Sequence, residues 1–244
     1  MKIPKSHPRF ESLKTRDLIV NGIKKGITSM HGLIAHGRGE AFDYLLGEKT
    51  SNFAKKSTEA ASWLLLLAKN PVISVNGNAA ALVPKELVEL SKMIPAPLEV
   101  NIFHPSKKRE LKIKKHLEKY GAKKVLLPNR KYKIKFLESS RKYVNPEGIF
   151  NADVVLAPLE DGDRTEVLIK NGKKVISVDI NPLSRTAQNA TITIVDNITR
   201  AMPLLIKNIN FLNKLDKNEL RHIIKNYDNK KILQKAVRHI RQLC

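Results

Sequence analysis

The stretch ADVVLAPLEDGDRTEVLIKNGKKVISVDINPLSRTAQNATITIVDN, residues 152–197, decides the fold. It holds three short apolar or β-branched runs, each followed by a polar loop, and two helical stretches lie between the runs. Runs that are apolar on both faces are typical of strands in a parallel sheet covered by helices. Strands that alternate with helices predict right-handed βαβ units and a doubly wound sheet.

The same alternation extends toward the N-terminus. We expect six strands in all, at residues 72–75, 98–103, 124–127, 153–157, 175–178 and 191–195. Helices are expected between them at residues 84–93, 107–120, 165–170 and 183–189. The sequence therefore predicts the α/β fold class, with a mainly parallel sheet of about six strands.

Three regions divide the chain of 244 residues. Residues 1–70 are expected to form an N-terminal helical segment, residues 71–196 the α/β core, and residues 197–244 two or three C-terminal helices. Within the core, residues 128–150 are rich in lysine and contain two prolines, so we predict an exposed insertion there. We expect the three regions to pack as one compact unit.

Breaks are expected inside two of the helical regions. A helix that begins near Thr28 is predicted to be interrupted at residues 37–39, which read Gly-Arg-Gly. Glycines there would let the backbone approach a ligand, and the helix that follows would offer N–H groups to an anion. A helix–helix corner with a solvated arginine explains these residues equally well. The C-terminal breaks are expected near Asp216 and Asn229.

The formal net charge of +22 raises the question of nucleic-acid binding. Residues 107–142 hold 12 lysines and 3 arginines against 3 glutamates, which is a net charge of +12. Arginine, the favoured residue for bidentate recognition, is the minority cation, and aromatic residues make up only 5% of the chain. We therefore expect nucleic acid not to be the physiological partner. A basic nucleic-acid-binding α/β protein remains an alternative.

Several other classes of protein are excluded. The longest apolar stretch, residues 63–68, is far too short to span a bilayer, and no signal segment stands at the amino end. The single cysteine, Cys244, excludes an intramolecular disulfide and a cysteine-based metal cage. The seven histidines show no zinc-binding spacing. We expect a cytoplasmic protein without membrane association.

Polar loops follow five of the expected strands. In an open parallel sheet, ligands bind beyond the carboxyl ends of the strands, so these loops should meet at one edge. Each loop by itself is compatible with an ordinary turn, but together they predict a ligand site. The loops are residues 76–78, 104–105, 160–164, 179–185 and 196–197.

Two of these loops allow more than one interpretation. Asp179 at a strand end is suited to accept a ribose hydroxyl, and Arg185 is suited to meet phosphate. Equally, Asp179 could cap the helix that follows. Glu160, Asp161 and Asp163 could hold Mg²⁺ or act on a proton, or they could form a turn and a helix cap.

The amino end concentrates positive charge around a predicted helix start, with His7, Arg9 and Arg16. This is either a mobile basic terminus or a clamp for an anionic substrate. The chain has neither the G-x-x-x-x-G-K-[ST] phosphate loop nor the G-x-G-x-x-G fingerprint. A nucleotide-dependent enzyme of another class, such as an NAD-dependent oxidoreductase, remains an alternative. The missing fingerprint counts against the oxidoreductase.

Six blocks of sequence, in this order, resemble the archaeal phosphopantothenate synthetases, the 4-phosphopantoate–β-alanine ligases. The most specific blocks are IAHGRGEAFDYL and PLEDGDRTE. The resemblance is thin over residues 106–148 and in the final helices. The blocks are residues 3–13, 32–50, 74–86, 152–166, 179–187 and 191–201.

The resemblance implies a Rossmann-like core, a homodimer, and a role in coenzyme A biosynthesis. The implied reaction converts ATP, 4-phosphopantoate and β-alanine to 4-phosphopantothenate, AMP and diphosphate. The implied ATP contacts are Arg16, Arg38, Asp179, Ile180, Asn181, Arg185, Thr186, Asn197 and Ile198.

For the chemistry we hypothesise that ATP adenylates the substrate carboxylate. Arg38 and Arg185, together with Mg²⁺ carried by the ATP phosphates, would neutralise charge on the leaving diphosphate. Asp163 is a candidate acceptor for the proton of the β-alanine amine. Candidates for the phosphopantoate end are His7, Arg9, His36, Asn76, Asn78 and Arg164.

Overall fold

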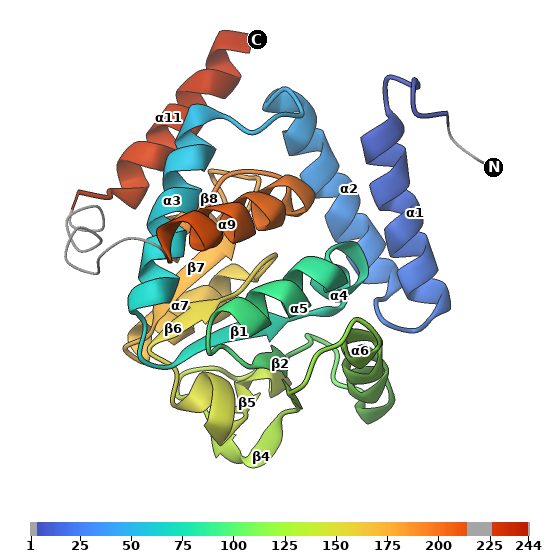
Figure 1. The fold of residues 1–244 in the computed structure, drawn as a ribbon, viewed down its shortest axis with the longest axis vertical. Helices are drawn as coiled ribbons and strands as arrows, with labels where there is room; N and C mark the ends of the chain where they lie inside the picture. The colour runs from blue at the N-terminus through green and yellow to red at the C-terminus, as the bar shows by residue number, and fades with distance from the viewer. Residues whose placement is uncertain (1–3, 214–225, 244) are drawn as a thin grey trace.

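A six-stranded, fully parallel sheet forms the centre of the computed structural model, which describes residues 4–213 and 226–243 (Figure 1). The strand order β3-β2-β1-β6-β7-β8 is that of a doubly wound Rossmann-like fold, as predicted. The strands are β1 (Pro71–Val75), β2 (Leu98–Val100), β3 (Val125–Leu126), β6 (Val154–Leu156), β7 (Lys174–Val178) and β8 (Ile192–Ile194).

The strand order reverses between β1 and β6, which pair with Ile73 opposite Leu156. From β1 the chain crosses to β2 on one side, and from β6 it crosses to β7 on the other. The loops that leave β1 and β6 therefore diverge, which opens a crevice at the carboxyl edge of the sheet.

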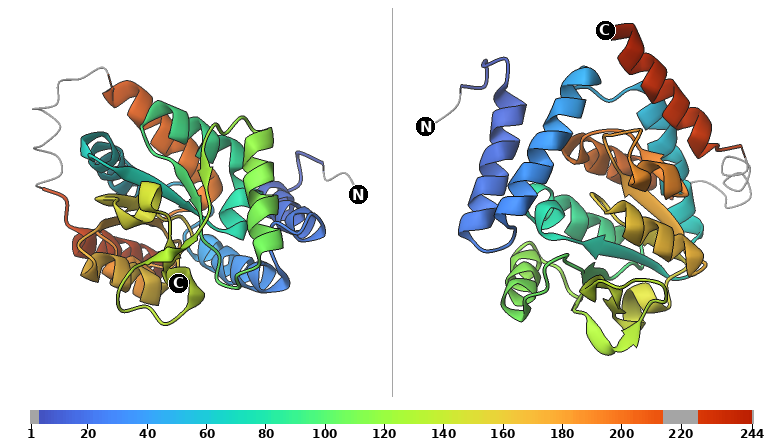
Figure 2. Two further views of the ribbon diagram at one scale, coloured as in Figure 1. Left: turned by 90° about the horizontal axis from the view of Figure 1, so that it is seen from below. Right: turned by 180° about the vertical axis from the view of Figure 1, so that it is seen from behind.

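Helices cover both faces of the sheet, which explains why its strands are apolar throughout (Figure 2). One face packs against α3, α5 and α9, and α1 and α2 lie side by side at the edge near the crevice. The helices are α1 (Phe10–Lys24), α2 (Met30–Leu45), α3 (Asn52–Leu67), α4 (Gly77–Leu82), α5 (Pro84–Met93), α6 (Lys107–Lys119), α7 (Gly162–Lys170), α8 (Arg185–Asn189), α9 (Ile198–Leu212) and α11 (Asn229–Leu243).

The C-terminal region contributes α9 and α11, and α11 begins at Asn229, where a break was expected. The expected break near Asp216 lies outside the described residues. Among the helices of the described ranges, none combines the length and the apolar character that crossing a membrane requires.

Residues 128–150 differ from the exposed insertion that their lysines suggested. They form a two-stranded antiparallel sheet, β4 (Asn129–Lys133) with β5 (Tyr143–Val144), and the short turns η1 (Ser140–Lys142) and η2 (Pro146–Phe150). Ile134, Leu137, Val144 and Ile149 are buried in one cluster with Val155 of β6. This segment therefore covers, with α7, the second face of the sheet. Most of its lysines face solvent, and so do Phe136 and Phe150.

Helix α2 runs without interruption through residues 37–39, contrary to the predicted break. A glycine inside a helix costs about 1 kcal/mol relative to alanine, which the contacts of α2 with α1 and α4 outweigh. No helix begins after Gly39, so the predicted row of N–H groups for an anion does not exist there. The two glycines instead leave this stretch of the helix without side chains on either side of Arg38.

Candidate active site

A cavity of about 740 Å³ lies at the carboxyl edge of the sheet, against α2. The loops after β1, β2, β6, β7 and β8 all contribute to its wall, as expected for a doubly wound fold. The predicted site residues that line it are His36, Arg38, Asn76, Asn78, Asp179, Ile180, Asn181, Arg185, Thr186, Asn197 and Ile198.

The loop after β7 is folded around the carboxylate of Asp179. This carboxylate accepts a hydrogen bond from the backbone N–H of Asn181 at 3.0 Å and another from the hydroxyl of Ser184. Ser184, and not Asp179, caps α8, by accepting the N–H of Ala187 at 2.9 Å. Burial raises the pKa of Asp179 against these hydrogen bonds. Asp179 thus shapes the loop that presents Arg185.

Arg185 begins α8 at the cavity wall, with 69% of its side chain exposed and Glu166 at 3.1 Å. A Cβ on Gly162 would overlap Cβ of Arg185, so the starts of α7 and α8 are packed as closely as a glycine allows. Thr186 donates its hydroxyl to the carbonyl of Glu160 at 2.8 Å and joins the same two helix starts.

The carboxylate of Glu160 lies buried between two guanidinium groups, those of Arg141 and Arg164. Burial alone would raise the pKa of Glu160, but the two cations outweigh it and hold the pKa below its ordinary value. Arg164, predicted at the substrate, is instead fully buried and also bonds Ser74 Oγ at 3.2 Å. Arg164 does not line the cavity, contrary to the position expected for it.

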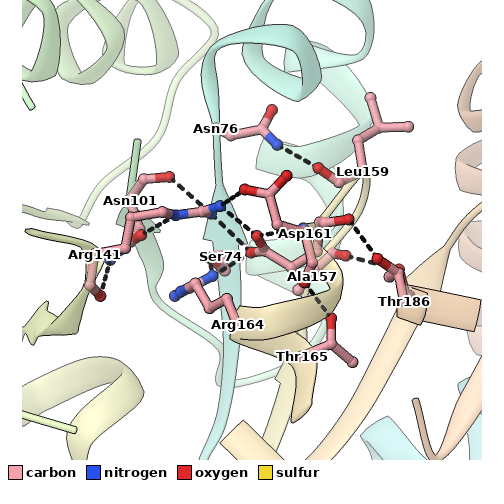
Figure 3. A network of polar contacts seen from close by, with 12 residues as sticks. Ser74, Asn76, Asn101, Arg141, Ala157, Leu159, Asp161, Arg164, Thr165 and Thr186 are labelled. Carbon is pink, nitrogen blue, oxygen red and sulfur yellow. Dashed lines mark hydrogen bonds and ion pairs between the residues drawn. The ribbon is translucent and has the colours of Figure 1, made fainter. Parts of the chain in front are cut away.

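Arg141 comes from the lysine-rich segment and was not predicted (Figure 3). Its side chain is 4% exposed and donates from Nε to Asn101 Oδ1 at 2.8 Å. Its Nη1 lies 2.6 Å from Asp161 Oδ2, and its Nη2 donates to Glu160 Oε2 at 2.8 Å. No sequence pattern separates Arg141 from its cationic neighbours, since only the folded chain shows that it is the one that turns inward.

A second charge cluster stands behind the cavity, where α1 meets α2. Arg16 binds Glu40 in a bidentate pair, with both N–O distances at 2.7 Å. Burial raises the pKa of Glu40, but the hydrogen bonds from Arg16 and Tyr44 outweigh it and lower the pKa to about 2. Arg9 joins from the start of α1, with Nη2 3.0 Å from the Tyr44 hydroxyl. Glu40 lines the cavity, whereas Arg9, Arg16 and His7 do not.

The far end of the cavity is rich in imidazole groups. His31 of α2 and His104 after β2 have ring centroids 5.0 Å apart, and Arg109 of α6 lies in the same wall. His36 is half-buried, and its Nε2 has no hydrogen-bond partner within the described ranges. Burial, the largest influence, lowers the pKa of His36 and so favours its neutral ring. The loop at 104–105 was predicted at this edge, but His31 and Arg109 were not singled out.

The two asparagines after β1 have their amide groups engaged inside the protein. Asn76 caps α4 by accepting the N–H of Ala79 at 2.9 Å, and it donates to the carbonyl of Leu159 at 2.6 Å. Asn78 accepts the hydroxyl of Thr28 at 2.5 Å and donates to the carbonyl of Gly32 at 2.8 Å. They tie the β1 loop to the β6 loop and to α2, respectively.

Asn197 caps α9 by accepting the N–H of Thr199 at 3.1 Å, and it donates to Asp43 Oδ2 at 2.8 Å. Arg200 bridges Asp43 and Asp196, with Nη2–Oδ1 distances of 2.5 and 2.7 Å. This ion-pair network, which the sequence did not suggest, joins α2 to the start of α9. It fixes the position of Asn197 in the cavity wall.

The three acidic residues considered for a magnesium site have different surroundings in the structure. Glu160 is taken by its two arginines, Asp161 lines the cavity, and Asp163 is exposed on the first turn of α7 outside the cavity wall. Across residues 4–213 and 226–243, no three His, Cys, Asp or Glu side chains converge as a metal site would require.

Comparison of the sequence with known proteins places the chain in one family. The family model for phosphopantothenate/pantothenate synthetase matches residues 53–243. The 4-phosphopantoate–β-alanine ligase of Thermococcus onnurineus is 52% identical over 242 residues, covering 99% of this chain and 93% of that protein. The ligase of the same name from Methanosarcina mazei is 49% identical over 240 residues, covering 98% and 94%. That from Methanospirillum hungatei is 43% identical over 240 residues, covering 98% and 97%.

Proposed function

Because the chain belongs to the phosphopantothenate/pantothenate synthetase family and is a ligase, we propose that it condenses 4-phosphopantoate with β-alanine at the expense of ATP. The product is 4-phosphopantothenate, an intermediate of coenzyme A biosynthesis. The cavity at the switch point of the sheet carries this proposal, since it has two chemically different halves that meet at the loop after β6.

The half formed by the β7 and β8 loops is suited to the nucleotide. Asp179 and Asn181 lie at the strand end where a ribose is bound in related folds, and half-buried Ile180 supplies apolar surface for a base. Ile198 lines the same cavity but is only 2% exposed. Arg38 and Arg185 are exposed cations on two sides of the cavity. Arg16 contributes indirectly here, by holding Glu40 of the same helix as Arg38.

The opposite half is suited to phosphopantoate. His31, His104 and Arg109 supply hydrogen-bond donors for a phosphate and a carboxylate. His36 also lines the cavity, but nearer Glu40 and Asp43. Arg9 and His7 lie outside the cavity wall, and the amides of Asn76 and Asn78 already have partners, so the imidazole-rich wall replaces them as the favoured phosphopantoate contact.

We propose that the reaction proceeds through an acyl-adenylate. An oxygen of the phosphopantoate carboxylate attacks the α-phosphorus of ATP, and diphosphate leaves with the bonding electrons. Arg38 and Arg185 stabilise the charge on diphosphate, and a preorganised donor of this kind contributes about 2.7–4 kcal/mol. The amine of β-alanine then attacks the acyl carbon and AMP leaves.

Magnesium fits this site as a companion of the ATP phosphates. The described residues hold no cluster of three metal ligands, and Mg²⁺ in such sites is bound mainly by phosphates and water. When bound, the ion neutralises part of the phosphate charge. Arg38 and Arg185 neutralise more of that charge from the protein side.

We also propose that the protein is a homodimer, as its resemblance to the family implies. Met30 and Ile34 are 61% and 67% exposed, and they lie one turn apart on α2. A second copy of the chain would cover this apolar surface. The mass of the purified protein in solution tests it, and a monomeric mass at micromolar concentration contradicts it.

The test of the proposed function is product analysis with ATP, Mg²⁺, 4-phosphopantoate and β-alanine. We expect AMP and diphosphate in equal amounts, and 4-phosphopantothenate only when all substrates are present. Exchange of labelled diphosphate into ATP, dependent on phosphopantoate and independent of β-alanine, tests the adenylate. If ADP and phosphate form instead, the reaction proceeds through an acyl phosphate and not through an adenylate.

A further inference from the structure

Five carboxylates line the cavity, and four of them are fully engaged by the protein. Glu40, Glu160, Asp179 and Asp196 each have both oxygens bonded to arginine, hydroxyl or backbone N–H groups. Asp161 is the exception. Its Oδ2 faces Arg141, whereas its Oδ1 accepts no hydrogen bond from any residue that the structure describes, and 52% of its side chain is exposed. Asp161 is therefore the carboxylate that remains available to a ligand.

Asp161 also lies where the two halves of the cavity meet, in the loop after β6. It follows β6, which borders the switch point, and Asn76 of the facing β1 loop holds Leu159 by a hydrogen bond of 2.6 Å (Figure 3). The nucleotide half begins on one side with Arg185, which packs against the neighbouring Gly162. The imidazole-rich half lies on the other side. An acyl group that joins the two halves would lie next to Asp161.

The surroundings of Asp161 hold it in place and leave it basic for an aspartate. Arg141 fixes Oδ2, and Asn101 in turn fixes Arg141 through Nε. Burial, the largest influence, raises the pKa of Asp161, and the negative charges of Glu160 and Asp163 raise it further against the opposing charge of Arg141. A raised pKa improves a carboxylate as a proton acceptor.

We propose that Asp161 binds the ammonium group of β-alanine through Oδ1 and accepts the proton that this group must lose before it attacks. This role rests on the proposed ligase function, in which an amine must react with an activated carboxyl group. Asp163, the acceptor that the sequence suggested, does not line the cavity, so we assign the role to Asp161.

One proton passes from the ammonium nitrogen to Oδ1 of Asp161, and the lone pair so formed attacks the acyl carbon. The bond between that carbon and the AMP oxygen breaks, and AMP leaves with the electron pair. The second proton is released from the nitrogen as the amide forms, and both protons pass to solvent, which the exposed edge of Asp161 contacts.

The experiment compares Asp161→Asn with wild type in the two half-reactions. Asparagine retains the size of the side chain and an oxygen for Arg141 but lacks the carboxylate charge. We expect phosphopantoate-dependent exchange of diphosphate into ATP to change less than threefold. Synthesis of 4-phosphopantothenate should fall by about 100-fold or more, the range for loss of a general base. Retained exchange also shows that the variant is folded.

A second nucleophile makes the test specific. Hydroxylamine is largely unprotonated at neutral pH and needs no base, so Asp161→Asn should still form the hydroxamate at close to the wild-type rate. Asp228→Asn, a change of the same kind at a half-exposed residue on the surface, is the matched control and should behave as wild type in every assay.

The outcomes separate the two proposals. If wild type shows no exchange, the adenylate route fails and the role of Asp161 fails with it. If wild type exchanges but Asp161→Asn loses exchange as strongly as amide synthesis, Asp161 serves ATP or Mg²⁺ and the β-alanine role is overturned. The same holds if Asp163→Asn, and not Asp161→Asn, shows the selective loss.

Discussion

The carboxylate of Glu99, fully buried in β2, accepts the backbone N–H of Ile149 at 2.7 Å. Its other oxygen accepts the N–H of Asn145 at 2.9 Å, so one side chain anchors the end of the 128–150 segment to the sheet. This segment also carries Arg141, which lines the cavity. Burial, opposed by these hydrogen bonds, raises the pKa of Glu99 from 4.5 to about 7.

The raised pKa of Glu99 predicts a pH-dependent stability. The unfolded chain releases this proton near pH 4.5 and the folded chain near pH 7, so between these values the folded state binds more protons. The free energy of unfolding should therefore fall as the pH rises through this window, by up to about 3 kcal/mol. Urea unfolding at a series of pH values measures it. Glu99→Gln should remove this slope, and a variant that keeps it unchanged contradicts the assignment to Glu99.

Replacement of Arg141 should damage both stability and the β-alanine step. Arg141→Met leaves the buried Glu160 with Arg164 as its single arginine partner. Breaking a buried ion pair lowers the free energy of unfolding by about 3–5 kcal/mol. The substitution also removes the hydrogen bond that holds Asp161 in position. The KM for β-alanine, measured on the folded fraction of the variant, should therefore rise at least tenfold. Arg130→Met, at an exposed arginine of the same segment, is the control. If Arg141→Met and Arg130→Met changed the KM for β-alanine equally, the positioning role of Arg141 would be contradicted.

Gly37→Ala tests the continuity of α2. A Cβ at Gly37 meets nothing within 4 Å, and alanine favours a helix over glycine by about 1 kcal/mol. We expect the free energy of unfolding to rise by about that amount, with catalysis retained. If the substitution lowered the free energy of unfolding, the result would instead favour the helix–helix corner that the sequence suggested at residues 37–39.

Arg38→Ala should act on the ATP half-reaction. Loss of a preorganised cation at the diphosphate lowers the rate by about 10²–10³-fold, so diphosphate exchange and amide synthesis should fall together. Arg238→Ala, at an exposed position on α11, is the matched control. If Arg38→Ala lowered amide synthesis alone, Arg38 would belong to the β-alanine step.

The cavity illustrates how far local sequence could reach. Polar loops after apolar strands predicted that Asp179, Arg185 and Asn197 would meet at one edge, because parallel strands place their carboxyl ends together. The same reasoning proposed Arg164, although its guanidinium lies under the sheet edge beside Ser74. Which side of a helix faces a cavity depends on how the helix packs, and a nine-residue helix such as α7 shows too little periodicity to reveal it.

The sequence by itself determined the doubly wound sheet, the edge at which ligands bind, and the family, because these follow from the spacing of apolar runs and from long blocks of similar residues. Only the tertiary structure decided that the lysine-rich segment is a cover for the sheet, that Arg141 turns inward, and that Asp161 rather than Asp163 faces the cavity. These outcomes depend on contacts between residues far apart in the chain. A charged residue is stable inside only where the fold brings it a partner, and no local pattern reports that partner.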